Sequence, residues 1–259
     1  MNAKIYVATH KRDNCLLKLK NPMYIPIHCG KAIYKDEPAY KGYLPEFGDD
    51  TGDNISAKNP NYCELTALYW IWRNDNSDPD DIVGLNHYRR YFSEPNNNMP
   101  ISKNSIIDLL WRGDYDFIVN GCGTERDDTK SDEESAYVGY KRNHTIADLE
   151  LALEGTEKMF PELFPRLDHE VRHSGAMCLC NMMITRKKYL DEYCSYLFPV
   201  LQYVESHIDL NDDNHQGYGA RVFGFLGERL FRPWLMASGH TGRQGPSLDW
   251  ERYSGYVWR

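Results

Sequence analysis

The apolar positions along the chain fall into two alternating patterns, which predict strands and helices that follow one another. Short apolar runs that end in charged or turn-forming residues are typical of buried strands. These runs occupy residues 4–9, 24–28, 82–85, 116–119 and 176–184. The last run is apolar almost throughout, so we expect it to form a central strand of a sheet.

Helices are expected where apolar residues recur every three or four positions. Such segments are found at 65–72, 102–111, from 146 onward, after 185, and at 219–231. Asn61 and Glu64 have the spacing of a capping box, in which two side chains satisfy free amides at the start of a helix. Thr185 is expected to cap the long helix that follows it, and Pro199 to kink or divide that helix.

Strands that alternate with helices predict an α/β fold: a single Rossmann-like domain with a mostly parallel central sheet flanked by helices. A length of 259 residues suits one such domain with insertions. We expect the domain to span 1–238. Residues 239–259 are expected to form an aromatic and basic tail packed on it, with Trp250, Tyr253, Tyr256 and Trp258.

The charge balance and the apolar pattern exclude several classes of protein. The 38 acidic residues outnumber the 30 basic ones, giving a net charge of −8, and there is no long basic run. Nucleic acid is therefore not an expected partner, because its phosphates require clustered cations. The opening MNAKIYVATHKRDN does not resemble a signal peptide, and no apolar stretch is long enough for a membrane span, so a cytoplasmic location is expected. The seven Cys include no C-x-x-C pair typical of a zinc ribbon.

Cationic side chains follow two of the expected strands. The first strand ends in Thr9, His10 and Lys11, and the strand at 82–85 leads into the sequence NHYRR, residues 86–90. In open α/β sheets, ligands bind beyond the carboxyl ends of the strands. Arg and Lys bind phosphate oxygens, so this edge predicts an anion site that suits a diphosphate. Alternatively, the two Arg are surface residues paired with carboxylates.

Five segments that occur in order carry a resemblance to a known family. They are IYVATHK, GDDTGDNISAKNPNYCELTALYWIWRN, DIVGLNHYRRYF, NMMITRKKYLDEYCSYLF and RVFGFLGERLF. Together they resemble bacterial capsular and exopolysaccharide biosynthesis proteins long described as a domain of unknown function, whose members are regarded as GT-A-type glycosyltransferases. The resemblance covers about residues 4–235. It implies a GT-A-like domain.

The activity implied by this resemblance is transfer of a hexose, with galactose favoured, from a nucleotide-diphosphate sugar, with UDP favoured. The acceptor would be a lipid-linked glycan in capsular, exopolysaccharide or O-antigen biosynthesis. A peripheral contact with the inner face of the cell membrane would follow. The chain has no amphipathic basic helix for docking on anionic lipid, so its substrate or partners would hold it there.

The donor site is assigned from the strand ends and from the part of the resemblance that follows the second strand. The expected donor-binding residues are Thr9, His10, Lys11, Asp53, Asn54, Lys58, Asn59, Tyr88, Arg89 and Arg90. The side chains at 53–59 can bond a ribose or a base. Alternatively, the Gly, Asp and Asn residues of this segment only form a turn.

Many GT-A enzymes hold a metal ion with an Asp-x-Asp sequence at the end of a middle strand. Here the corresponding strand ends in Asn86, His87 and Tyr88, which offers few oxygen ligands for a divalent ion. We therefore expect no metal site and no required cofactor. Mn²⁺ or Mg²⁺ held through His87 and a remote carboxylate is the alternative, and His87 is one of two expected catalytic residues.

The other expected catalytic residue is Glu228, as the general base that an inverting transfer requires. Arg221 and Glu228 are seven residues apart and share a helix face, with Gly224 between them. A structural cluster with the neighbouring Arg is the alternative. Asp116, Asp212 and Asp213 could replace Glu228, and a retaining reaction would need no single base.

His173 and Ser174, in the sequence VRHSGAM, are assigned with Arg221 to the acceptor side. An Arg-His pair also suggests a phosphohydrolase with a phosphohistidine nucleophile. Such a motif usually follows the first strand, whereas this one lies late in the chain. A non-catalytic glycan-binding or assembly module, with the aromatic tail as a stacking platform, is the remaining alternative.

Overall fold

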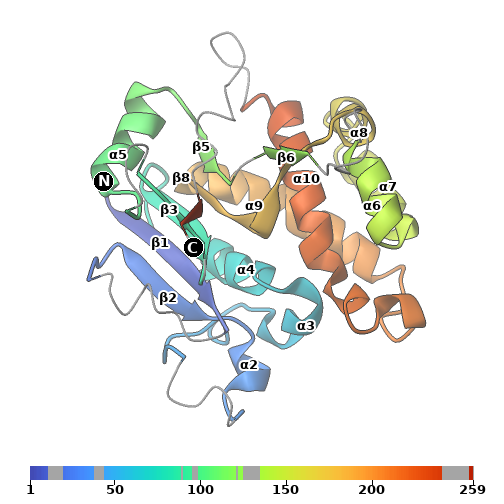
Figure 1. Cartoon of the computed structure of the whole chain (residues 1–259), viewed down its shortest axis with the longest axis horizontal. Coiled ribbons are helices and arrows are strands. Elements are labelled where there is room, and N and C mark those ends of the chain that lie inside the picture. Colours follow the sequence, from blue (N-terminus) through green and yellow to red (C-terminus); the bar gives the residue numbers. More distant parts are fainter. Residues whose placement is uncertain are drawn as a thin grey trace.

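The computed structural model describes residues 1–10, 20–37, 44–88, 90–94, 99–120, 122–124, 135–240 and 257–258. Its centre is a sheet of five strands in the order β2-β1-β3-β8-β5. The strands are β1 (Ala3–Thr9), β2 (Tyr24–His28), β3 (Ile82–His87), β5 (Phe117–Val119) and β8 (Met183–Arg186). β1 is parallel to β2 and β3, whereas β8 is antiparallel to both β3 and β5. The sheet is therefore mixed, with only β8 reversed (Figure 1).

The register brings the carboxyl ends of three parallel strands to one level. Thr9 of β1 lies opposite His28 of β2, and Ala8 lies opposite His87 of β3. Close packing of β3 against β8 depends on Gly84, because a Cβ there would lie 2.8 Å from the carbonyl oxygen of Met183. The residues that follow these three strands therefore meet at one edge of the sheet.

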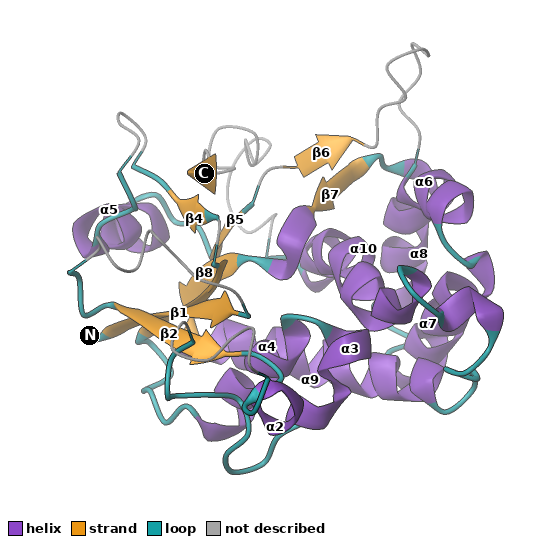
Figure 2. Ribbon diagram, turned by 60° about the horizontal axis from the view of Figure 1, so that its bottom comes forward, coloured by secondary structure: helices purple, strands orange, loops and turns teal. Residues whose placement is uncertain are grey.

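Helices cover both faces of the sheet (Figures 1 and 2). On one face lie α4 (Leu65–Asn74), α9 (Lys187–Glu205) and α10 (Val222–Ser238). On the other lie α5 (Lys103–Ile107) and the π-helical turn η3 (Asp108–Arg112). The period of two along β1 explains the division, because Tyr6 and Ala8 pack in the first core while Ile5 and Val7 pack in the second.

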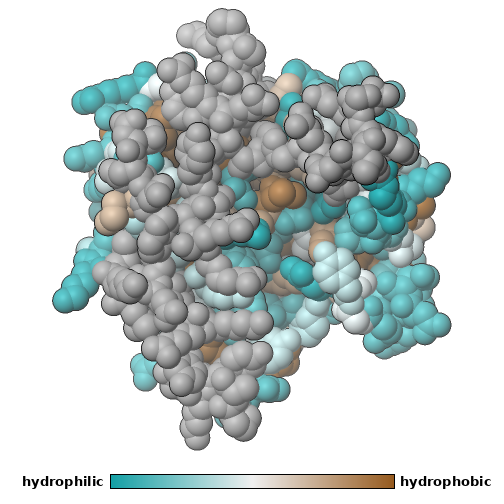
Figure 3. All heavy atoms as spheres, viewed as in Figure 1, coloured by the Kyte–Doolittle hydropathy of each residue, from teal (hydrophilic) through white to brown (hydrophobic). Residues whose placement is uncertain are grey.

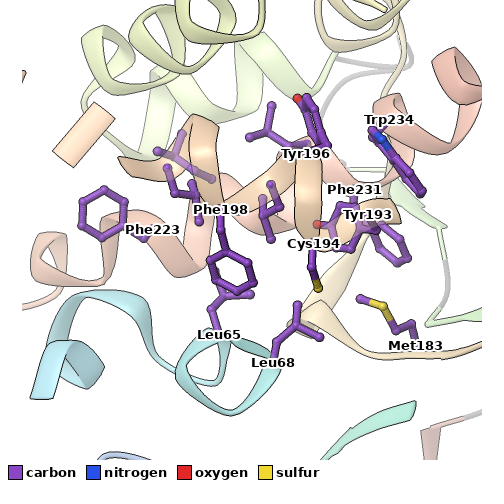
Figure 4. Packing of buried hydrophobic residues seen from close by; sticks show 14 of the residues in the cluster. Leu65, Leu68, Met183, Tyr193, Cys194, Tyr196, Phe198, Phe223, Phe231 and Trp234 are labelled. Carbon is purple, nitrogen blue, oxygen red and sulfur yellow. The ribbon is translucent and has the colours of Figure 1, made fainter. Parts of the chain in front are cut away.

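The larger core is rich in aromatic side chains from α9 and α10 (Figure 4). Trp234 is fully buried, and its ring centroid lies 5.0 Å from that of Tyr193. Leu65 and Leu68 of α4 enter the same cluster. This packing fixes α10 against the sheet, and with it the polar residues that α10 carries.

The remaining elements are short, apart from three helices that gather beside α10 (Figure 1). These helices are α6 (Ala136–Asn143), α7 (Ile146–Met159) and α8 (Phe164–His173). The others are α2 (Lys31–Tyr34), η2 (Ser56–Lys58), α3 (Asn59–Tyr62), β4 (Tyr91–Phe92), β6 (Cys122–Thr124), β7 (Ala176–Cys178), η4 (Leu179–Asn181), η5 (Asp213–His215), η6 (Gly219–Arg221) and β9 (Val257–Trp258). β4 pairs with β9 and β6 with β7, both antiparallel.

The fold class predicted from the sequence is confirmed, and some local expectations are wrong. Residues 176–184 do not form one strand, because Cys180 and Asn181 have left-handed φ angles of 66° and 47° that separate β7 from β8. Thr185 lies inside β8, where its hydroxyl donates to the carbonyl of Asp116 at 2.6 Å, so it caps no helix. α9 continues through Pro199 and is not divided there, whereas the kink expected as the alternative stays a prediction.

The capping box predicted at Asn61 and Glu64 is also wrong. Asn61 lies inside α3, and its side-chain amide donates to the carbonyl of Ala220 at 2.8 Å. Glu64 accepts instead from the side chain of Asn181 at 2.8 Å. Both side chains are thus used for tertiary contacts rather than for the start of a helix.

The expected boundary at residue 238 coincides with the end of α10, and most of the expected tail lies outside the described residues. The two-part division of the chain stays a prediction. In the described part of the face in Figure 3, hydrophilic residues predominate and apolar ones show only in small areas. Among the described residues, none of the helices combines the length and the hydropathy that a bilayer crossing requires.

Candidate active site

A cavity of about 420 Å³ lies at the carboxyl ends of β1, β2 and β3. This is the edge of an open α/β sheet at which ligands usually bind. The strand ends and the segments that follow them contribute Ala8, His10, His28, Cys29, Tyr34, His87 and Tyr88. The opposite wall consists of Asn59, Pro60, Cys63, Glu64 and Arg221.

Aromatic rings from two strand ends pack together at the floor of this cavity. The ring centroid of Tyr88 lies 4.6 Å from that of His10 and 4.6 Å from that of His87. A further ring at the strand ends is that of His28, which β2 contributes. It is buried, and its Nε2 atom has no hydrogen-bond partner among the described residues. Burial lowers the pKa of His28, so its ring is neutral at pH 7 and can donate or accept one hydrogen bond to a ligand.

Glu64 supplies the carboxyl group of the cavity. It precedes α4, just after Cys63, whose φ of 51° separates α3 from α4. The pKa of the half-buried Glu64 is raised to about 7, chiefly by burial and also by the negative charge of Glu228. The hydrogen bond from Asn181 and the charge of Arg221 act in the opposite direction. Near pH 7, Glu64 is therefore able both to take and to give a proton.

This pKa predicts how Glu64 affects stability. The carboxyl of the folded protein keeps its proton up to about pH 7, whereas in the unfolded chain it ionises near its ordinary value of 4.5. The folded state is therefore penalised increasingly as the pH rises from 4.5 to 7, and fully above 7. Glu64→Gln lacks this penalty and is expected to raise the free energy of unfolding by about 3 kcal/mol at pH 8, and hardly at all near pH 4.

Urea denaturation of the native protein and of Glu64→Gln at the two pH values measures this difference. Gln can still accept the hydrogen bond from Asn181, so the substitution changes the charge while preserving that contact. Equal gains in stability at pH 4 and pH 8 would contradict the raised pKa.

A strained loop holds Glu64 in place. Cys180 and Asn181 both adopt left-handed φ angles, which are unfavourable for residues other than glycine and tend to occur at functional sites. The backbone amide of Cys180 donates to Oε1 of Glu228 at 2.6 Å, and Nδ2 of Asn181 donates to the carbonyl of Gly224 at 3.1 Å. α10 thus anchors the loop whose Asn181 binds Glu64.

Arg221 contributes a permanent positive charge to the cavity. It ends the turn η6, immediately before α10, and its Nε donates to the thiol of Cys63 at 3.3 Å. Its guanidinium carbon lies 5.2 Å from the ring centroid of Phe225. The stacked guanidinium is well placed to meet an anionic ligand.

The cavity brings together five of the residues that the sequence predicted for the site. They are His10, Asn59, His87, Tyr88 and Arg221. Thr9 is close by but buried, and its hydroxyl donates to the carbonyl of Val7. Lys11 and Arg89 lie outside the described residues.

Three predicted donor residues are engaged elsewhere and do not line the cavity. Asp53 accepts from Nε of Arg73 at 2.7 Å, and Lys58 pairs with Glu205 at 2.7 Å. Asn54 accepts from the backbone amide of Ser56, which is the turn interpretation considered above. In this structure their described partners are protein groups.

The other predicted residues lie behind the cavity or away from it. Arg90 contacts the thiol of Cys180, and Glu228 holds the same residue through its backbone amide. His173 and Ser174 are at the end of α8, where the hydroxyl of Ser174 accepts from Arg232 at 3.0 Å. None of these four residues lines the cavity, and their functional roles stay predictions.

Sequence reasoning missed Glu64 and His28. Glu64 was interpreted as part of a capping box. Its side chain instead accepts a hydrogen bond from Asn181, which is 117 positions away along the chain. His28 ends its strand just as His87 ends β3, so the rule applied to the other strand ends could have found it.

The cavity contains one carboxylate and three His, but these do not form a metal-ligand cluster. Within the described ranges, no group of three or more His, Cys, Asp or Glu is arranged to hold a metal ion. The expectation of metal independence remains a prediction.

Comparison with known proteins places the chain in a family. The profile described as Domain of unknown function (DUF4422) matches residues 4–239, and the chain belongs to this family. The structure is also similar to the apo structure of WbbM, a bifunctional glycosyltransferase, with a TM-score of 0.77 and 28% identity. The match covers 94% of this chain and 44% of that chain, so this chain spans less than half of WbbM. No curated protein matches. The fold is therefore GT-A-like, as the sequence predicted.

Proposed function

We propose that the protein is a glycosyltransferase that moves a hexose from a nucleotide-diphosphate sugar to a glycan acceptor. The observation that carries this proposal is a carboxyl group, Glu64, with a pKa of about 7 in a cavity at the carboxyl edge of β1, β2 and β3. The edge suits a nucleotide, and the pKa suits a base that acts near neutral pH. The similarity to WbbM supports the reaction class.

In the proposed reaction, an acceptor hydroxyl attacks the anomeric carbon of the donor sugar and Glu64 takes its proton. The bond between the anomeric carbon and the phosphate oxygen breaks, and the nucleoside diphosphate leaves with the electron pair. Arg221 offsets the charge that develops on this leaving group. Glu228 acts indirectly in this scheme, by fixing the loop from which Asn181 orients Glu64.

For the substrates, we favour UDP-galactose as donor and a lipid-linked glycan of capsular polysaccharide, exopolysaccharide or O-antigen as acceptor. The support is the sequence resemblance to proteins of those pathways. The reaction would take place in the cytoplasm, at the inner face of the membrane. We propose transfer that requires no metal, with Mn²⁺ or Mg²⁺ dependence as the alternative.

The donor site is tested by calorimetric titration with UDP and with UDP-galactose, in Mn²⁺ and in chelator. The native protein is expected to bind both with micromolar dissociation constants in either condition. Arg221→Met keeps the length of the side chain but removes its charge. It is expected to weaken binding by about 10- to 100-fold, which corresponds to loss of a charged hydrogen bond.

The matched control is Arg112→Met, because the Arg112 side chain is 80% exposed on η3, on the opposite face of the sheet. Its dissociation constants should equal those of the native protein. Binding only in Mn²⁺ would overturn metal independence. A folded protein that binds no nucleotide would contradict the donor site and favour the non-catalytic glycan-binding module.

A further inference from the structure

A second cavity, of about 480 Å³, lies among the helices of the C-terminal half. Its walls come from the end of α6, the start of α7, the segment around η5 and η6, and the first turns of α10. These elements lie on the side of the molecule away from β1 and β2 (Figures 1 and 2). The first cavity, which is the proposed donor site and is called the donor cavity below, is lined mainly by other parts of the fold, although η6 contributes to both.

Three aromatic rings, those of His144, Tyr218 and Phe225, pack together in the lining of the second cavity. The ring centroid of Phe225 lies 4.1 Å from that of His144 and 4.9 Å from that of Tyr218. Tyr218 is 65% exposed, which is unusual for a large aromatic side chain. An exposed aromatic ring that packs against other rings is a platform for a ligand with apolar faces.

Polar groups surround this platform. Asn143, Asp148 and Asn214 line the cavity, as does Tyr140, which is fully buried. The Tyr140 hydroxyl has no hydrogen-bond partner in the described part of the chain. An unpaired buried hydroxyl is unfavourable unless a ligand or a water satisfies it. Amide, carboxylate and hydroxyl groups around an aromatic platform match the hydroxyl groups and C–H faces of a sugar ring.

The second cavity adjoins the first through Arg221. This residue lines the donor cavity, while its guanidinium carbon lies 5.2 Å from the ring centroid of Phe225 and 5.8 Å from that of Tyr218. A chain of sugars seated on Tyr218 could therefore extend past Arg221 towards Glu64. One acidic residue, Asp148, and one basic residue, Arg142, line the second cavity, so its lining has no excess of either charge, which suits an uncharged ligand.

We propose that this second cavity, between α6, α7 and α10, is a carbohydrate-binding subsite for the acceptor, in which a sugar ring stacks on Tyr218. The assignment to the acceptor rests on the proposed function, whereas carbohydrate binding by the cavity does not. The ligand class is a neutral oligosaccharide. Its reacting end would point towards the donor cavity.

The test is binding of the labelled full chain to an array of bacterial capsular and O-antigen oligosaccharides, followed by titration with the glycan that binds best. Tyr218→Ala removes the platform and is expected to weaken this binding at least about tenfold, as truncation of a binding tyrosine commonly does. Tyr218→Phe keeps the ring and is expected to bind within about twofold of the native chain. Val138→Ala, at an exposed position of α6 outside both cavities, is the surface control.

Excess UDP should leave the glycan bound to the native chain, because the two cavities are separate. Displacement by UDP, equal binding by Tyr218→Ala, or absence of binding to every oligosaccharide would each overturn the proposal. UDP titration of the native chain separates this result from the proposed function. Nucleotide binding without glycan binding refutes only the subsite, whereas glycan binding without nucleotide binding refutes only the donor site.

Discussion

Replacing Glu64 by Gln is expected to lower kcat for sugar transfer by about 10²- to 10⁴-fold, the usual contribution of a positioned general base. Gln preserves the volume of the side chain and its hydrogen bond from Asn181, so the loss comes from the missing proton acceptor. The loss should appear in kcat rather than in the KM for the donor, since the proton moves only in the transition state. Initial rates with a radiolabelled UDP-sugar and an acceptor glycan measure both constants.

The pH profile of kcat/KM identifies the base, because this constant reports the ionisable groups of the free enzyme. A carboxylate base is active when ionised, so the native kcat/KM is expected to rise with pH and to level off above about 7, the pKa of Glu64. Glu64→Gln should lack this rise. In Glu228→Gln the rise should remain but move to lower pH, because the negative charge of Glu228 raises the pKa of Glu64.

The two variants therefore show which residue is the base: Glu64, which the structure indicates, or Glu228, which the sequence predicts. Loss of the rise in Glu228→Gln together with its retention in Glu64→Gln would show that Glu228 is the base. The backbone amide of Cys180 can still donate to a Gln at 228, so the loop keeps this anchor in the variant.

Replacing Trp234 by Ala is expected to lower the free energy of unfolding by about 3–5 kcal/mol, as truncation of a buried aromatic residue usually does. Trp234 is 1% exposed, and its ring packs against Tyr193 at 5.0 Å and Phe117 at 5.9 Å between centroids. Its loss would leave a cavity between α9, α10 and the sheet (Figure 4). The melting temperature should fall by about 10 °C.

Urea denaturation followed by circular dichroism measures this loss. Met159→Ala, at a position 38% exposed at the end of α7, is the control and should change stability by less than about 0.5 kcal/mol. A loss below about 1 kcal/mol in Trp234→Ala would mean that the aromatic cluster does not anchor α10.

Most of the strands and helices could be predicted because their signals are local. The apolar runs of β1, β2 and β3 were found to within two residues at each end, and the helix spacing located α4 and α10. The local prediction failed at 176–184, where every residue except Asn181 is apolar. The contacts of Cys180 and Asn181 with Glu228 and Gly224 stabilise two left-handed residues there.

For the candidate site, too, some features could be predicted from the sequence and others could not. The ends of parallel strands must meet at one edge, so His10, His87 and Tyr88 could be assigned to a common site from the sequence. Helix periodicity predicted that Arg221 and Glu228 share a helix face, but Arg221 lies in η6, one residue before α10 begins, and periodicity does not show what packs there. In the folded protein Arg221 reaches the cavity, while Glu228 binds the backbone of the loop at Cys180.

The sequence by itself determined the α/β class, the order of the elements and the edge of the sheet at which the cavity forms, because these follow from the local pattern of apolar residues. The tertiary structure alone decided that Glu64 is the carboxyl group of that cavity and that its pKa is raised. Both depend on the hydrogen bond from Asn181 and on the charges of Arg221 and Glu228, all more than 100 positions away along the chain, and on burial that exists only after α4 and α10 have packed together. Periodicity fixes which side chains share a face, whereas burial and charge at a site depend on every segment that meets there.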